Sequence, residues 1–93
     1  MEKELESANE RFPQFHSEHE GWAIMQEEAE ELQGECASIG MAMEQLWHRI
    51  RGGIPTAQHV ALVEQYAEAA ACEAIQVAAM ARKYLDMLER MDE

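Results

Sequence analysis

The sequence is poor in positive charge. Its 93 residues include 7 Lys and Arg against 19 Asp and Glu, which gives a formal net charge of −12. Direct binding to nucleic acid is therefore not expected, because few cations are present to neutralise phosphates. The acidic excess leaves three uses open: solubility, a bound divalent metal ion or a basic protein partner.

Cysteine and long apolar runs are also scarce. The two cysteines, Cys36 and Cys72, lie far apart in the chain, and we expect free thiols in a reducing cytoplasm. No apolar run approaches the roughly 20 residues of a membrane span, so no membrane partner is expected. The stretch MEKELESANERF at the start is acidic and polar, unlike a signal peptide. A cytoplasmic location is the resulting expectation.

Proline is nearly absent, and its two occurrences divide the chain. Pro13 and Pro55 are the only prolines, and a proline interrupts a helix because it lacks an amide hydrogen and crowds the preceding turn. The sequence predicts a short N-terminal segment (1–15) and two long helices (17–51 and 56–91). All three belong to one domain over residues 1–93, since the chain is too short for more.

Capping residues stand at the ends of both predicted helices. Ser17 and Glu20 have the S-x-x-E spacing of a capping box, which predicts the start of the first helix. That helix should end at RGGIP, where Gly52 and Gly53 can cap it and the proline cannot continue it. Thr56 is then a candidate N-cap for the second helix.

Apolar residues recur along both predicted helices at alternating spacings of three and four, which is typical of a packed helix. We call these residues the apolar series: Trp22, Met25, Ala29, Leu32, Cys36, Ile39, Met43, Leu46 and Ile50, then Val60, Val63, Ala67, Ala70, Ala74, Val77, Ala81, Tyr84, Leu88 and Met91. Two such helices joined by a short turn predict an antiparallel hairpin. A lone hairpin cannot cover its own apolar faces, so we expect an all-α fold in which two hairpins dimerise into a four-helix bundle.

A second series with the same spacing runs beside the apolar one. We call it the acidic stripe: Ile24, Glu28, Glu31, Glu35, Ser38 and Ala42, then Leu62, Tyr66, Ala69, Glu73, Gln76, Met80, Lys83 and Met87. Folding the hairpin about residue 52 puts Glu28 level with Gln76 and Glu31 level with Glu73. Four oxygen-bearing side chains then converge, which suits Mg²⁺ or Mn²⁺. A solvated acidic face is the alternative that the pattern leaves open.

The same residues resemble the motifs of a known family. EEAEE, with Glu27, Glu28 and Glu31 in an E-E-x-x-E pattern, is followed later by EAIQVAAMARKYL. Together they resemble the all-α nucleoside triphosphate pyrophosphohydrolases, the MazG-like and dimeric dUTPase-like superfamily, and within it a small, often phage-borne branch. The likeness covers roughly residues 16 to 88.

The resemblance implies a helical bundle, dimeric or tetrameric, that uses Mg²⁺ to cleave a nucleotide between its α- and β-phosphates, giving a monophosphate and pyrophosphate. It implies Glu28, Glu31 and Glu73 as metal ligands, with Glu27 binding a further metal or activating the attacking water. The family's second motif is E-x-x-D, whereas Gln76 occupies the Asp position here. Its carbonyl can still ligate Mg²⁺, with one negative charge fewer.

Three further residues are candidate contacts to the nucleotide. Lys83, on the acidic stripe, and the adjacent Arg82 can hold a phosphate, and Trp22 can stack on a base. An ordinary surface charge and a packed tryptophan are the alternative interpretations. Two other functions also stay open: nucleotide binding without hydrolysis, and an acidic helical protein that captures a basic host protein.

Overall fold

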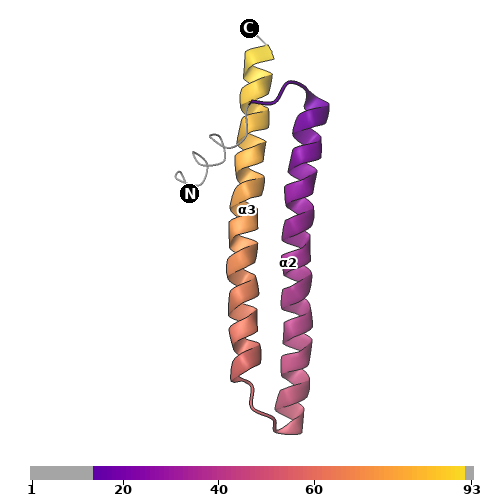
Figure 1. Cartoon of the computed structure of the whole chain (residues 1–93), viewed down its shortest axis with the longest axis vertical. Coiled ribbons are helices and arrows are strands. Elements are labelled where there is room, and N and C mark those ends of the chain that lie inside the picture. The colour runs from indigo at the N-terminus through magenta and orange to yellow at the C-terminus, as the bar shows by residue number, and fades with distance from the viewer. Residues whose placement is uncertain (1–13, 92–93) are drawn as a thin grey trace.

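The computed structural model describes residues 14–91, which form two long helices lying side by side and running in opposite directions (Figure 1). Helix α2 spans Glu18–Gly52 and helix α3 spans Ala57–Met91, 35 residues each. No strand occurs among these residues. The all-helical architecture is therefore confirmed, and the helix ends differ by at most one residue from the predicted 17–51 and 56–91.

Local capping contacts determine where α2 begins and ends. The Ser17 hydroxyl accepts a hydrogen bond from the Glu20 amide at 3.1 Å, which is the N-cap contact of the predicted capping box. After α2, Gly53 has φ 67° and ψ 25°, a left-handed conformation that glycine adopts at little cost. Its amide donates to the Ile50 carbonyl at 3.2 Å. On the other side of the turn, the Thr56 carbonyl accepts hydrogen bonds from the third and fourth amides of α3 at 3.0 and 3.1 Å.

Most of the residues buried between the two helices belong to the acidic stripe, whereas Met25, Tyr84 and Leu88 of the apolar series pack against the core while only partly buried. Ala42, Met80, Lys83 and Met87 are buried, and all four belong to the acidic stripe. Several members of the apolar series stay largely exposed: Trp22 (61%), Met43 (50%), Ile50 (54%), Val60 (51%) and Met91 (62%). The stripe on which the sequence predicts converging side chains is therefore the one that lies between the helices.

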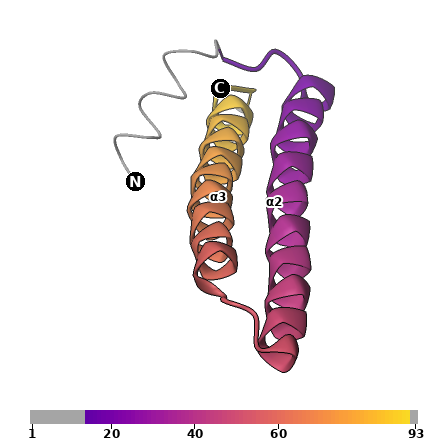
Figure 2. The ribbon, with the colours of Figure 1, turned by 60° about the horizontal axis from the view of Figure 1, so that its bottom comes forward.

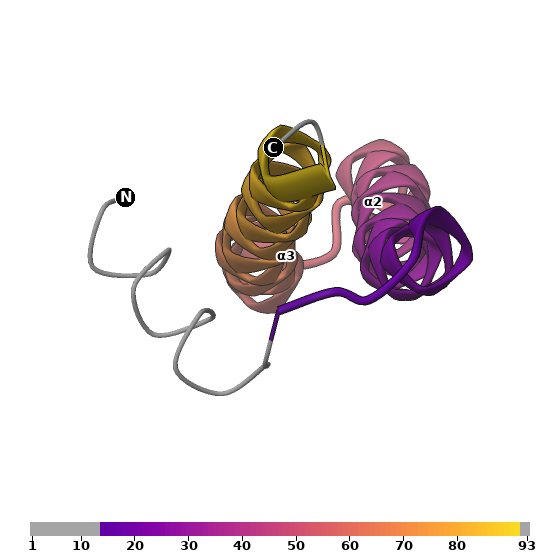
Figure 3. The same ribbon diagram turned by 90° about the horizontal axis from the view of Figure 1, so that it is seen from above.

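The reason for this difference is geometric. Each apolar series follows the acidic stripe by one residue, which is a rotation of about 100° around a helix. Because α2 and α3 are antiparallel, this rotation turns both apolar series to the same side of the hairpin. Figures 2 and 3 show the helices as a single layer, so nothing in the described chain covers that side. We call this surface, formed by the apolar series of both helices, the apolar face.

A small core lies at the end of the hairpin that is away from the turn. Phe15, just before α2, is 1% exposed and packs with Ala79, Met80 and Met87 of α3. Its carbonyl accepts a hydrogen bond from the Arg90 guanidinium at 3.2 Å. The segment before α2 is thus tied to the end of α3 by both an apolar and a polar contact.

Two further sequence predictions concern the N-terminal segment and membrane-spanning helices. The predicted N-terminal segment (1–15) lies outside the described residues except for its last two. Within residues 14–91, neither helix has a stretch that is long and apolar enough to cross a membrane.

Two helix glycines are expected to respond oppositely to alanine. A Cβ at Gly21 would lie 2.5 Å from Cδ2 of Tyr84 and 3.2 Å from Cδ2 of Phe15, whereas a Cβ at Gly34 would meet nothing within 4 Å. Gly34→Ala should raise the free energy of unfolding by about 0.5–1 kcal/mol, because alanine is the better helix former. Gly21→Ala should lower it by about 1–3 kcal/mol, because the Tyr84 ring must move. Urea unfolding followed by circular dichroism measures both, and a Gly21→Ala protein as stable as Gly34→Ala would contradict the close packing.

Candidate functional site

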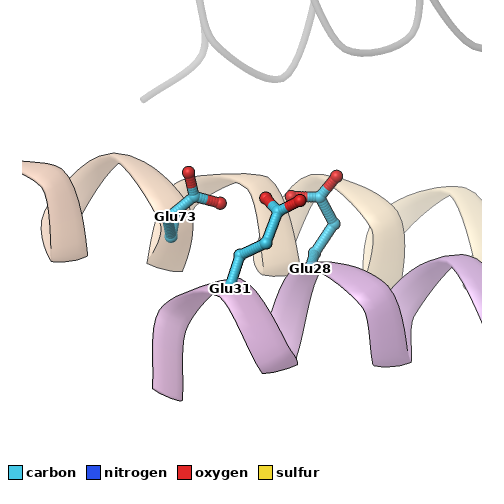
Figure 4. A group of neighbouring side chains, drawn as sticks. All are labelled: Glu28, Glu31 and Glu73. Carbon is cyan, nitrogen blue, oxygen red and sulfur yellow. The ribbon is translucent and has the colours of Figure 1, made fainter. Parts of the chain in front are cut away.

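Three glutamates meet on the acidic stripe between the helices (Figure 4). Glu28 and Glu31 come from α2 and Glu73 from α3, and one carboxylate oxygen of each lies within 4.8 Å of those of the others. Glu28 and Glu31 share a face because they are three residues apart on a helix. The antiparallel register brings Glu73 opposite them, so the structure gathers three of the four predicted metal ligands into one cluster. We call it the carboxylate cluster.

Burial and mutual repulsion together make the carboxylate cluster difficult to ionise completely. The pKa of Glu73 is raised from 4.5 to about 7. Partial burial of this carboxyl is the main cause, followed by hydrogen bonding with Glu31 and by the negative charges of Glu31 and Glu28. Its Oε2 atom is buried and has no hydrogen-bond partner within the described part of the chain. A cation placed among these oxygens would relieve both the repulsion and the unpaired acceptor.

The other two residues predicted at this site lie at its edges. Gln76 is partly buried on α3, three residues after Glu73 and so on the same face, where it offers a neutral oxygen. Glu27 is exposed on α2 and is not one of the three converging carboxylates. Because it precedes Glu31 by four residues, the two are neighbours on the helix surface. Glu27 therefore lies at the outer rim of the carboxylate cluster.

Arg82 and Trp22 lie away from the carboxylate cluster. The Arg82 guanidinium is on the surface of α3, where it pairs with Asp86 at 3.1 Å and with Glu89 at 3.6 Å. Trp22 is 61% exposed on the apolar face, six residues or about 9 Å along α2 from Glu28. The structure does not bring either side chain to the three carboxylates, and their predicted contacts to a nucleotide stay predictions.

Lys83 is on the acidic stripe, as the sequence spacing requires, but it is buried. It is only 4% exposed, and its Nζ atom lies 4.9 Å from the centre of the Phe15 ring, within the range of a cation–π contact. Burial lowers the pKa of this ammonium, and the nearby Glu20 charge partly offsets the effect. Lys83 thus belongs to the small core around Phe15, away from the turn and seven residues from Gln76.

Sequence reasoning missed a polar grouping nearer the turn. His59 Nε2 of α3 lies 3.2 Å from Gln45 Oε1 of α2, and Ser38, Gln45 and Tyr66 line a cavity between the helices. Folding the chain about residue 52 places Gln45 level with His59 and Ser38 level with Tyr66. The same register that predicts the carboxylate cluster could therefore have found these pairs.

The raised pKa of Glu73 predicts that the metal-free protein loses stability as pH rises. A carboxyl with an ordinary pKa of 4.5 and a folded-state pKa of about 7 keeps its proton longer in the folded state. The free energy of unfolding should therefore fall as pH rises from 4.5 through 7. Glu73→Gln keeps the shape without the charge, and well above pH 7 it should be more stable than the wild type by about 1–2 kcal/mol.

Urea unfolding in the presence of EDTA across this pH range provides the measurement. Glu44→Gln is the matched control, because Glu44 is an exposed glutamate on α2 outside the carboxylate cluster. The difference in stability between wild type and Glu73→Gln should grow with pH, while Glu44→Gln should follow the wild type. Parallel pH profiles for all three proteins would show that Glu73 is not electrostatically strained.

Comparison with known proteins adds no relative from which a function could be transferred. No protein-family model matches the chain, and no curated protein or solved structure matches it. The resemblance of residues 16–88 to the MazG-like motifs therefore stays a prediction from the sequence.

Proposed function

We propose that this protein is a Mg²⁺-dependent nucleotide pyrophosphohydrolase whose carboxylate cluster holds the metal ion. The observation that carries the proposal is the convergence of three carboxylates from two facing helices within 4.8 Å of one another. Helical bundles build metal sites from side chains on facing helices in this way. The E-E-x-x-E motif that includes Glu28 and Glu31 adds support, because its resemblance points to nucleotide chemistry.

The donor set suits a hard divalent cation. All three converging side chains are carboxylates, and Gln76 can add an amide oxygen, so the ligands are oxygens as Mg²⁺ and Mn²⁺ prefer. The charges of Glu31 and Glu28, which after burial help to raise the pKa of Glu73, would attract the ion. Mg²⁺ usually keeps several ligand positions for water and phosphate oxygens, which leaves room for a nucleotide.

Each residue of the site has a part in the proposed reaction. Glu28, Glu31 and Glu73 would hold the ion, and bound Mg²⁺ neutralises phosphate charge and lowers the pKa of a coordinated water. Glu27, exposed at the rim beside Glu31, would accept the proton of the attacking water. Addition of this water would break the anhydride bond between the α- and β-phosphates and give a nucleoside monophosphate and pyrophosphate.

We further propose that two copies of the chain pack through the apolar face to form a four-helix bundle. The face runs along two 35-residue helices, each about 52 Å long, and no member of the apolar series is charged. Soluble monomers rarely leave so extended an apolar surface uncovered. A second copy fits because it brings an identical uncharged surface, while the acidic residues of both chains stay outside the contact.

Nucleotide binding without hydrolysis is a second candidate function, and Gln76 favours it. The motif that the second helix resembles has an Asp at this position, and an amide supplies one negative charge fewer. A weaker site for the cation still allows a nucleotide to bind while slowing or abolishing its cleavage. Product formation separates the two candidates.

Pyrophosphate release from a panel of ribo-, deoxyribo- and modified nucleoside triphosphates tests the hydrolase. Release by the full chain should require Mg²⁺ or Mn²⁺ and should stop with EDTA. Glu31→Gln removes one of three converging carboxylates and should lower kcat/KM by about 100-fold or more. Glu44→Gln, the exposed control on the same helix, should leave the rate unchanged.

Thermal unfolding with and without Mg²⁺ shows which proposal fails if no product forms. A rise in Tm with Mg²⁺ in the wild type but not in Glu31→Gln, together with nucleotide binding, would favour the non-catalytic candidate. No rise in either protein would contradict the metal site.

Sedimentation velocity tests the dimer with two methionines of α2. Met43 is 50% exposed on the apolar face, whereas Met41 is 63% exposed and lies outside it. Met43→Glu would bury an unpaired charge in the interface and should weaken the dimer at least about tenfold, while Met41→Glu should leave it intact. A wild type that stays monomeric at every concentration, or equal effects of the two substitutions, would contradict packing through this face.

A further inference from the structure

We propose that an open pocket at the helix ends away from the turn binds a guanidinium group, the group that an arginine side chain carries. The pocket has a volume of about 330 Å³ and is lined by Glu18, His19 and Trp22 of α2 and by Tyr84 of α3. Ligand pockets in proteins usually measure about 300 Å³ or more, so a small ligand fits. None of the four residues belongs to the carboxylate cluster, and the inference does not depend on the proposed hydrolysis.

Two contacts hold the Tyr84 ring in the pocket. Its hydroxyl donates to Glu18 Oε1 at 2.9 Å, which joins the first turn of α2 to α3 at the end of the hairpin away from the turn (Figure 1). On α2 the ring lies against Gly21, where a Cβ would be only 2.5 Å from Tyr84 Cδ2. Because glycine has no side chain, the ring can approach the helix this closely. The ring is therefore in place before any ligand binds.

Trp22 supplies a second aromatic ring. It is 61% exposed and follows Glu18 by four residues and His19 by three, so the three side chains share one face of α2. The face of an aromatic ring is electron-rich and attracts cations, and tryptophan is the strongest of the aromatic residues in this contact. Two rings beside a carboxylate form a site for an organic cation.

The charge near the pocket also favours a cation. The half of α2 that begins at the pocket (18–35) contains no lysine or arginine but seven glutamates: Glu18, Glu20, Glu27, Glu28, Glu30, Glu31 and Glu35. Lys83, next to Tyr84 in the chain, does not line the pocket; its ammonium lies over the Phe15 ring and is attracted by Glu20. A positively charged ligand is therefore drawn toward this end of the hairpin.

The Glu18 carboxylate favours a guanidinium over other cations. The hydrogen bond from Tyr84 reaches Oε1 and leaves Oε2 to accept from a ligand. A guanidinium can donate N–H groups to a carboxylate while its flat face stacks on an aromatic ring. A quaternary ammonium has no N–H group to donate, and a neutral urea group has no charge. Both should bind more weakly.

The pocket is complete within one chain, since all four lining residues belong to it. Trp22 and Tyr84 are also members of the apolar face, so a second copy packed there would compete with the cation for the same rings. Met43→Glu, the substitution that should weaken the dimer, lies 21 residues or about 31 Å along α2 from Trp22. This variant should therefore bind the cation at least as tightly as the wild type.

Titration of α-N-acetyl-arginine amide into the full chain tests the pocket, with EDTA present so that the metal site plays no part. The indole N–H NMR signal of Trp22 should shift with a Kd of about 1 mM or below, which is ordinary for a ligand of this size. Trp47 is the internal control, because it is 56% exposed and lies 25 residues or about 37 Å along α2 from Trp22. Its indole signal should stay in place.

Two ligands of different chemistry test the preference for a guanidinium. α-N-acetyl-citrulline amide has nearly the same shape without the charge, and tetramethylammonium has the charge without an N–H group. Each should bind about tenfold more weakly or worse than the arginine amide. Binding of either as tight as that of the arginine amide, or equal shifts of both indole signals, would overturn the assignment.

Substitutions at the pocket separate the charge from the ring. Glu18→Gln keeps an acceptor for Tyr84 but removes the charge, and it should weaken binding about tenfold or more. Trp22→Leu keeps an apolar side chain without the ring and should weaken binding about 2- to 30-fold, with Trp22→Phe recovering part of the loss. Glu44→Gln and Trp47→Leu are the matched controls at exposed positions. Wild-type affinity in both Glu18→Gln and Trp22→Leu would show that the pocket is not the site.

The tripeptide acetyl-Ala-Arg-Ala-amide distinguishes the two sources of a guanidinium. Binding at least as tight as that of the arginine amide supports an arginine on the surface of a partner protein, whereas binding tenfold weaker supports a free small molecule. Either result agrees with a guanidinium site. Binding by the wild type but not by monomeric Met43→Glu would contradict a site contained in one chain.

Discussion

The register between the two helices is the constraint on which the rest of this structure depends. It is set where α2 ends, at the left-handed Gly53, because the short turn leaves α3 little freedom to slide. One register places Glu31 level with Glu73, Ser38 with Tyr66 and Gln45 with His59, and the contacts at the carboxylate cluster and at Gln45 follow it. A shift by one residue in either helix would rotate its side chains by about 100° and would separate the facing groups at every level.

This register brings three glutamate side chains close together, where their negative charges repel. Hairpins normally place their apolar residues against each other, yet here partly buried glutamates lie between the helices while Trp22 and Met43 stay exposed. Such an arrangement costs stability in a lone hairpin, because the carboxylates repel and apolar area remains in water. Both costs would disappear if a cation occupied the carboxylate cluster and a second copy covered the apolar face, so the two proposals explain one observation together.

The sequence predicted those features that local chemistry controls. The cap at Ser17, the end of α2 at Gly53 and the alternating spacings depend on near neighbours in the chain, and the facing of Glu31 and Glu73 follows from the turn position alone. The exposure of Trp22 and Met43 could not be predicted, because the spacing of the apolar series does not show what covers it. The contact of Phe15 with Lys83 was equally inaccessible, since it joins residues far apart in the chain through packing at the open end.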